Sequence, residues 1–273
     1  MTVLVTGATG TVGRHLLDAL PGPVHALTRR PDRTDLPAHV RPVAALDLTG
    51  VTAVFVHPRA VADPFDLVRR AREAGVTKVV ALSAANVDDP PDQQPSRYRG
   101  DRNKEAEDAV VGSGLPWVSL RAASFAENTA TAWAAQIRAG DTVRGPHADF
   151  AEALLHERDL AEVAARALTT DTLDGRRLHL TGPHSHTHRD LVTLIGHALG
   201  RPLTYAETPP DAAAGHLRGA GLPEPFVTAL MARYARGAGR PAEVTDEVAR
   251  VLGRARTYPD WLTDHLHLFR EQA

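Results

Sequence analysis

The sequence predicts an α/β fold, a doubly wound parallel sheet (a Rossmann fold) followed by a smaller and mostly helical C-terminal region. Short apolar runs alternate with amphipathic runs as far as Leu120. A glycine-rich turn separates the first apolar run from the first amphipathic run. After Phe150 the pattern changes to stretches rich in Ala, Gly and Pro. Alternation of this kind is typical of βαβ units that share a parallel sheet.

The expected elements follow in chain order. Strands are expected at 3–5, 24–27, 41–45, 52–57, 78–82, 117–120, 176–182 and 203–206. Helices are expected at 13–20, 65–74, 103–111, 157–168 and 189–199, and residues 209–255 are expected to be mostly helical. The connection between the third and fourth strands, 46–51, is shorter than the dozen or so residues a crossover helix needs, so a loop or single turn is expected there.

Composition excludes several function classes. The chain has 273 residues, of which 43% are hydrophobic, which is enough for a sizeable core. Its formal net charge of −2 offers no basic field for nucleic acid or an anionic membrane. The absence of cysteine excludes disulfides and thiol catalysis. No signal-like or membrane-spanning run is found, so a cytoplasmic protein is expected. We also expect it to be a monomer or a homodimer.

The glycine-rich turn, 6–13, reads TGATGTVG and opens the first helix. Gly7 permits a tight turn, Gly10 allows the backbone to approach a pyrophosphate, and Gly13 allows the helix to pack close to the sheet. The start of the helix then presents free N–H groups and the positive end of its dipole to the phosphates. Because the motif stands in strand–turn–helix context, it predicts a dinucleotide site.

The end of the second strand indicates which dinucleotide binds. An NAD site places an acidic residue there, about 20 residues after the glycines, to bind the ribose 2′-hydroxyl. This chain has Arg29 and Arg30 instead. Two guanidiniums suit a 2′-phosphate, so the sequence favours NADP(H).

Several further motifs resemble those of NmrA-like members of the atypical short-chain dehydrogenase/reductase family. They are the TGATGTVG start, ALSA around Ser83, and the runs SGLPWVSLRAASFAEN (113–128), HERDLAEVAARAL (156–168), GRRLHLTGP (175–183) and TLIGHALGRPLTY (193–205). The resemblance covers nearly the whole chain and is least secure over 209–255. It implies a dinucleotide-binding core over 1–150 and a substrate-binding or lid region over 151–273.

The resemblance also implies roles for individual residues, all at the carboxyl ends of strands. The pyrophosphate would contact Gly7, Thr9, Gly10, Thr11 and Val12, and the 2′-phosphate would contact Arg29 and Arg30. The adenine would lie beside Asp47 and Leu48. The ribose and nicotinamide would lie beside His57, Pro58, Ser83 and Ala84.

The acid/base pair of ordinary family reductases, Tyr-x-x-x-Lys, is missing. Tyr98 and Lys104 are six residues apart, which on a helix leaves them about 120° out of alignment. Anchored on Glu107, which precedes the SGLP turn in relatives, the tyrosine position holds Arg99 and the lysine position holds Asn103. Tyr98 and Lys104 are therefore either neighbours of a degenerate site or a charged helix start.

The proton for a reduction would then come from another source. Ser83, water or a substrate hydroxyl beside the carbonyl could supply it, and Tyr98 stays a second catalytic candidate. If the segment is only a helix start, Asp101 is the expected N-cap.

The function that the resemblance implies is NADPH-dependent reduction of a ketone or quinone on a hydrophobic, aromatic polyketide-type metabolite, as in antibiotic biosynthesis. The alternatives are a non-catalytic redox sensor that binds NADP(H) and an isomerase or epimerase that uses the cofactor transiently. No metal is expected, since His184, His186 and His188 fall in a loop. The residues expected to line a substrate pocket are Phe125, Trp133, Phe226 and Met231.

Overall fold

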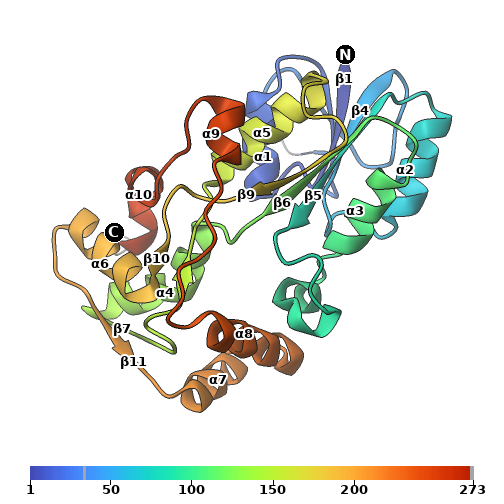
Figure 1. Ribbon diagram of the computed structural model, residues 1–273. Helices are drawn as coiled ribbons and strands as arrows, with labels where there is room; N and C mark the ends of the chain where they lie inside the picture. Colours follow the sequence, from blue (N-terminus) through green and yellow to red (C-terminus); the bar gives the residue numbers. More distant parts are fainter. Residues whose placement is uncertain (33–34, 271–273) are drawn as a thin grey trace.

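A seven-stranded parallel sheet forms the centre of the protein in the computed structural model, which describes residues 1–32 and 35–270 (Figure 1). Its order is β3-β2-β1-β4-β5-β6-β9, with the reversal of strand order between β1 and β4 that defines a doubly wound sheet. The strands are β1 (Thr2–Thr6), β2 (Val24–Leu27), β3 (Val40–Val43), β4 (Val51–Val56), β5 (Lys78–Ala84), β6 (Trp117–Ala122) and β9 (Arg176–Leu180). The predicted fold class is confirmed.

Helices cover both faces of this sheet, as its apolar strands require. On one face α1 packs against α5, and on the other α2 packs against α3. Each face has its own buried cluster, centred on residues such as Leu16 and Leu160 on the first face and Leu67 and Val110 on the second. The helices are α1 (Thr11–Ala19), α2 (Pro64–Glu73), α3 (Asn103–Val111) and α5 (Glu157–Thr169).

The chain between β3 and β4 has no helix, as the short spacing predicts. Most other predicted elements are present with ends shifted by one or two residues. The helix α4 (Glu127–Ala139) is an addition that the pattern did not predict. It has only four buried residues among thirteen, so its amphipathic signal is weak.

The C-terminal half contributes both to the sheet and to a second layer. Strand β9 completes the central sheet and helix α5 packs against α1 on one of its faces, while a separate apolar cluster lies around Trp133 and Trp261. The predicted division near residue 150 stays a prediction. The remaining elements are β7 (Thr142–Gly145), β8 (Ala151–Glu152), β10 (His186–Thr187), α6 (His188–Leu199), β11 (Thr204–Glu207), α7 (Pro210–Gly219), α8 (Glu224–Gly237), α9 (Glu247–Leu252) and α10 (Tyr258–His265).

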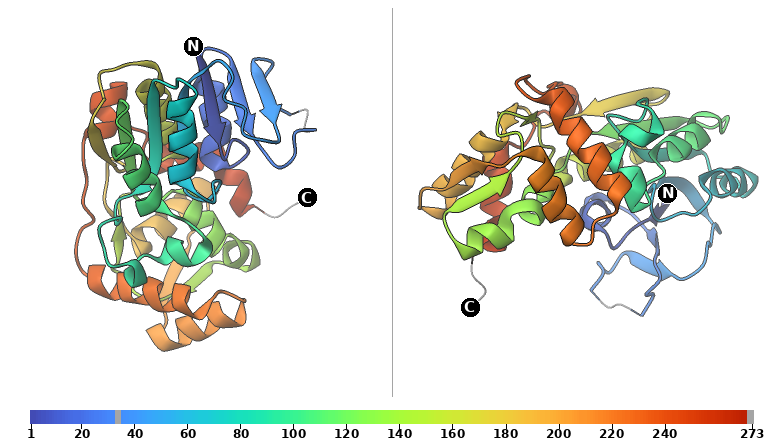
Figure 2. Two further views of the ribbon diagram at one scale, coloured as in Figure 1. Left: turned by 90° about the vertical axis from the view of Figure 1, so that its right-hand side faces the viewer. Right: turned by 90° about the horizontal axis from the view of Figure 1, so that it is seen from below.

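The described residues also form three short 3₁₀ turns, η1 (Pro91–Gln93) and η2 (Pro95–Arg99) between β5 and α3, and η3 (Leu266–Phe269) after α10. Helix α8 packs against η1 and η2, so the segment after β5 and the C-terminal half lie side by side (Figure 2). Among the described residues, none of the helices is both long and apolar enough for a membrane span.

One capping prediction is wrong. Asp101 does not cap α3, whose N-cap is Arg102 without a side-chain bond. Instead, both carboxylate oxygens of Asp101 accept hydrogen bonds from Arg59, at 2.7 and 2.8 Å. Arg59, which is distant in sequence but close in space, therefore binds the Asp101 carboxylate that the local sequence pattern predicts as the cap of α3.

Candidate cofactor and active site

The glycine turn between β1 and α1 has the backbone geometry of a phosphate cradle. Gly7 has φ of +68°, in the left-handed region, and its carbonyl accepts from the Gly10 N–H at 3.0 Å. A Cβ added to Gly13 would lie 2.2 Å from that carbonyl oxygen. No described side chain caps α1, so its first amides stay available to an anion. The cradle therefore fits a dinucleotide pyrophosphate.

His57 lies against this cradle at the end of β4. Its backbone N–H donates to Thr6 Oγ1 at 2.7 Å, and a Cβ added to Gly7 would lie 2.8 Å from the imidazole ring. Burial lowers the pKa of His57, so the ring is neutral at pH 7. Its Nδ1 accepts from the Arg59 N–H at 3.2 Å, which puts the proton on Nε2. Pro58 follows, and its carbonyl accepts from the Arg102 N–H.

Ser83 lies at the carboxyl end of the neighbouring strand β5 and has an unpaired hydroxyl among the described residues. Its side chain is buried, and its Oγ has no hydrogen-bond partner among the described residues. Buried hydroxyls normally have a partner, so this atom fits a site that a ligand completes. Ala84, the next residue, accepts from the Val87 N–H through its carbonyl. The predicted nicotinamide end is thus built from β4 and β5 side by side.

The opposite end of the predicted site is cationic. Arg29 and Arg30 follow β2 and are exposed, and neither forms an ion pair with a described carboxylate. Backbone and side-chain hydrogen bonds from Thr49 lower the pKa of Asp47, which also lies 3.4 Å from Arg41. Because the Asp47 carboxylate already has Thr49 and Arg41 as partners, it competes little for the guanidiniums of Arg29 and Arg30. Leu48, beside Asp47, accepts from the Val51 N–H and turns the chain into β4.

The segment where the Tyr–Lys pair would stand has different chemistry. Asn103 is buried and donates to Ser96 Oγ at 3.2 Å, and the Arg99 guanidinium lies 5.7 Å from the Phe226 ring centre. Lys104 pairs with Asp108 four residues on, as a charged helix surface would. Tyr98 is half-buried in η2, and its catalytic role stays a prediction.

The four residues predicted to line a substrate pocket lie in different layers. Trp133 is buried in the C-terminal core, with its ring edge-on to His188 and Tyr205. Phe125 and Met231 are half-buried, and Phe226 lies beside Arg99 on α8. Substrate contact by these residues stays a prediction.

Sequence reasoning missed an ion pair at the end of β6. Arg233 on α8 donates to Glu152 Oε1 at 2.7 Å and to Ser124 Oγ at 2.9 Å, and its guanidinium lies 5.1 Å from the Phe150 ring centre. Burial opposes ionisation of Glu152, but Arg233 outweighs it and the pKa of the carboxyl is lowered. Ser124 lies in a family motif, but Arg233 and Glu152 are 109 and 28 residues away from it in the sequence. A local sequence pattern therefore does not predict that these three residues meet. This pair holds α8 over the carboxyl end of β6.

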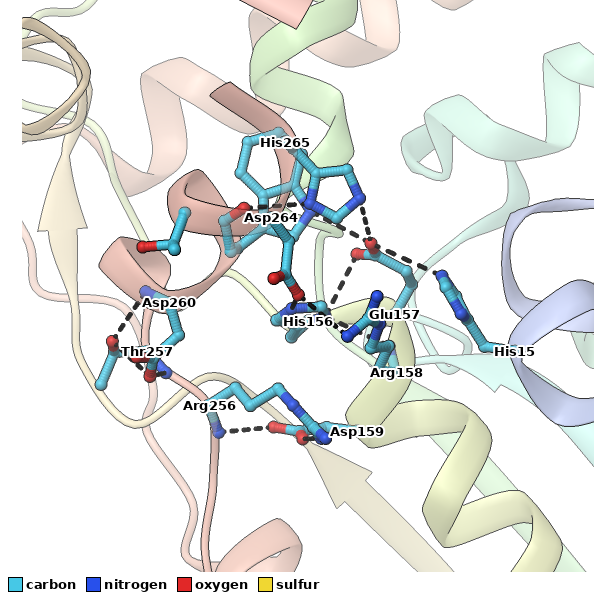
Figure 3. Close-up of polar contacts among 12 residues, drawn as sticks. His15, His156, Glu157, Arg158, Asp159, Arg256, Thr257, Asp260, Asp264 and His265 are labelled. Atoms are coloured by element: carbon cyan, nitrogen blue, oxygen red, sulfur yellow. Dashed lines mark hydrogen bonds and ion pairs between the residues drawn. The ribbon is translucent and has the colours of Figure 1, made fainter. Parts of the chain in front are cut away.

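A second polar cluster fixes α1 to the C-terminal half (Figure 3). Glu157, buried at the start of α5, lies 3.0 Å from His265 Nε2 and 3.9 Å from His15 Nε2 on α1. Trp261 on α10 donates its indole N–H to the same carboxyl at 3.2 Å. Burial raises the pKa of Glu157 and lowers the pKa of the adjacent His156 to about 4. The helix that carries the cradle is therefore held by α5 and α10 together.

The structure also contains two grooves and the three alternating histidines His184, His186 and His188. One groove of about 580 Å³ runs between β9 and residues 243–255, and one of about 230 Å³ lies between α2 and α3. Neither is lined by a predicted cofactor residue. His188 is buried against Phe150 while His184 lies against His186, so the three alternating histidines do not converge. Among the described residues, no group of three His, Asp or Glu is arranged to hold a metal.

Comparison with known proteins agrees with this geometry. The sequence model of an NAD(P)H-binding family matches residues 7–171. A "(4-alkanoyl-5-oxo-2,5-dihydrofuran-3-yl)methyl phosphate reductase" of Streptomyces griseus is 37% identical over 98% of this chain and 99% of its own. An "NAD(P)H azoreductase" of Xenophilus azovorans is 28% identical over 98% of this chain and 99% of its own.

A solved structure has the same fold. The NADPH-dependent quinone oxidoreductase of Escherichia coli in complex with NADPH has a TM-score of 0.80 and 21% identity, covering 99% of this chain and 100% of that one. The chain therefore belongs to the NAD(P)H-binding family and is an NAD(P)H-dependent oxidoreductase.

Proposed function

We propose that the protein uses NADPH to reduce a conjugated, electron-poor acceptor on a hydrophobic secondary metabolite. The observation that carries the proposal is the replacement of the acid/base pair, with Arg99 and a buried Asn103 at its two positions. The bound nicotinamide supplies the hydride. An isolated ketone also needs a proton donor at its oxygen. A conjugated acceptor spreads the new negative charge over several atoms, so water can supply the proton afterwards.

The relatives' names support an acceptor of this kind. The substrate named for the Streptomyces griseus enzyme has a ring double bond conjugated with a ring carbonyl and an alkanoyl carbonyl. Quinones and azo compounds, named for the other two proteins, likewise delocalise the charge that hydride brings. For this chain we propose a quinone or an acylated unsaturated lactone. A ketone of an aromatic polyketide is the narrower alternative, because a phenolic hydroxyl beside it could supply the proton.

Two residues suit the developing charge. The unpaired Ser83 hydroxyl and the Nε2–H of neutral His57 stand at the ends of the two strands nearest the predicted nicotinamide. Hydrogen-bond donors aimed at a developing oxyanion stabilise the transition state. We propose that Ser83 and His57 orient the nicotinamide and the acceptor, and that neither acts as a strong acid.

Turnover on a matched panel tests the proposal. NADPH oxidation is expected with 1,4-quinones and with an α-alkanoyl butenolide, and little or none with a saturated ketone of similar size. Oxidation of the isolated ketone at equal kcat/KM would contradict the argument from the missing pair. Tight NADPH binding without turnover of any acceptor would favour the redox sensor.

The arginines after β2 give a prediction about cofactor choice. Replacing Arg29 and Arg30 together with alanine is expected to weaken NADPH by about tenfold to a hundredfold, because charge-assisted hydrogen bonds to the 2′-phosphate contribute about 1.5–3 kcal/mol. NADH, which lacks that phosphate, is expected to bind within about twofold of wild type, since it makes none of these bonds. Titration of each cofactor checks this, and Arg144→Ala, an exposed arginine on β7, is the control. Equal loss of both cofactors would remove the 2′-phosphate assignment.

A further inference from the structure

The segment from η2 to the N-cap of α3 carries more positive charge than its neighbours neutralise. Arg97 is paired with Glu105, because its Nη1 donates to Oε2 at 3.1 Å and its Nη2 donates to Oε1 at 2.7 Å. Arg99 and Arg102 form no ion pair with any carboxylate of the described residues. The Arg102 guanidinium donates, within the described part of the chain, to the backbone carbonyls of Arg97 and Asp101, each at 3.2 Å. Two guanidiniums are thus available to an anion from outside the chain.

This segment is fixed beside the predicted nicotinamide end. The Arg102 N–H donates to the Pro58 carbonyl at 3.2 Å, and Arg59 pairs with Asp101 through two hydrogen bonds. These three hydrogen bonds tie the segment to the loop after β4, where His57 lies against the glycine cradle. An anion bound here would therefore be part of whatever lies next to the nicotinamide, far from the 2′-phosphate end after β2.

The side chain of Arg99 is held in a way that suits an anion. Its guanidinium lies over the Phe226 ring of α8, at 5.7 Å from the ring centre, while the residue remains exposed. Helix α8 packs against η2, so the ring is a fixed support. Stacking uses the face of a guanidinium and leaves its edge N–H groups for a phosphate, which they bind in bidentate fashion.

We propose that Arg99, assisted by Arg102, binds a phosphate ester on the substrate. The inference rests on the proposed function and deepens it, because the Streptomyces griseus relative is named for a phosphate ester. Arg99 occupies the position where ordinary family reductases have their tyrosine, so a cation replaces the acid. The substrate of this chain is then an acylated unsaturated lactone, or a similar conjugated acceptor, that carries a phosphorylated hydroxymethyl arm.

The experiment compares a phosphate ester with its own alcohol. The probes are a (4-alkanoyl-5-oxo-2,5-dihydrofuran-3-yl)methanol and its phosphate, titrated into the NADP⁺-loaded protein, so that binding is measured without turnover. The phosphate is expected to bind wild type about tenfold to a hundredfold more tightly than the alcohol. Arg99→Gln is expected to remove most of this difference, and Arg99→Lys to keep part of it, because a lysine ammonium keeps the charge without the fork.

Controls separate this site from the cofactor and from general charge. Arg99→Gln should leave the affinities for the alcohol and for NADPH within about twofold, because neither ligand has a group at the proposed phosphate contact. Arg144→Ala should change none of the affinities for the phosphate ester, the alcohol and NADPH. The phosphate preference should also fall as ionic strength rises, because the contact is exposed.

The outcomes distinguish the two proposals. If wild type does not prefer the phosphate, or if Arg99→Gln weakens both lactones equally, the anion subsite is wrong while reduction of quinones could still be observed. If Arg99→Gln weakens NADPH as much as the phosphate ester, the arginine serves the cofactor and the subsite is also wrong. If the phosphate preference depends on Arg99 but no lactone or quinone is reduced, the subsite stands and the proposed function falls.

Discussion

Gly13→Ala is expected to weaken NADPH binding by on the order of a hundredfold and to lower the stability of the fold. The new Cβ would lie 2.2 Å from the Gly7 carbonyl oxygen and 2.8 Å from the Ala8 backbone. Both contacts are with backbone atoms, so either α1 must move away from β1 or the Gly7 turn must open. Overpacking of this kind costs about 1–3 kcal/mol, and the upper end corresponds to about a hundredfold in affinity.

Two other glycines separate the causes of that loss. A Cβ on Gly10 would lie 3.3 Å from the Gly7 carbonyl oxygen, so Gly10→Ala should fold nearly as well as wild type but block the approach of the pyrophosphate. Gly215 in α7 has nothing within 4 Å of its added Cβ, so Gly215→Ala should not reduce stability or binding. Thermal unfolding and NADPH titration of the three variants give the test. Wild-type affinity in Gly13→Ala would exclude the cradle as the pyrophosphate site.

The sequence predicts the sheet and the glycine turn after β1 well because both depend on local pattern. The strand–turn–helix around Gly7 and the apolar strands such as 52–57 are set by residues close together in the chain. The short 46–51 connection also follows from length alone. In these places a few adjacent residues determine the structure, and tertiary contacts do not override them.

The residues that sequence reasoning missed are all joined across long separations. Arg233 meets Glu152 and Ser124 only because α8 folds back over β6, and Glu157 meets His265 only because α10 returns to α5. The Asp101 error has the same cause, since Arg59 is 42 residues away. Charged side chains pair with groups that lie close to them in the folded structure, and the periodicity of the sequence does not predict which distant residues come close.

Glu107 illustrates how such a partner set determines stability. This carboxylate on α3 is fully buried and accepts from Ser119 Oγ at 2.6 Å, from Arg121 Nη2 at 2.6 Å and from Arg177 Nε at 3.0 Å. It therefore joins α3 to two parallel strands, β6 and β9. Burial alone would raise the pKa of Glu107, but hydrogen bonds from Arg121, Ser119 and Arg177 outweigh it and lower the pKa to about 2.

Glu107→Gln is accordingly expected to reduce the free energy of unfolding at pH 7 by about 3 kcal/mol, because breaking a buried ion pair costs about 3–5 kcal/mol and both arginines retain some access to water. Glu73→Gln, at an exposed pair with Arg69 on α2, should cost less than about 1 kcal/mol. Urea unfolding of the three proteins measures this. A loss in Glu107→Gln no larger than in Glu73→Gln would contradict the stabilising role of the buried carboxylate.

The pH dependence gives an independent check on the same carboxylate. A group whose pKa is lower in the folded state than in the unfolded state stabilises the fold above its unfolded pKa and loses that effect as pH falls through its folded pKa. For Glu107 these values are 4.5 for the ordinary carboxyl and about 2 for the folded protein. The stability difference between wild type and Glu107→Gln should therefore be constant above about pH 5 and shrink steadily as pH falls toward 2. A difference that stays constant through this range would mean that the glutamine acts by altered packing, and that the charge of Glu107 does not hold β6 and β9 to α3.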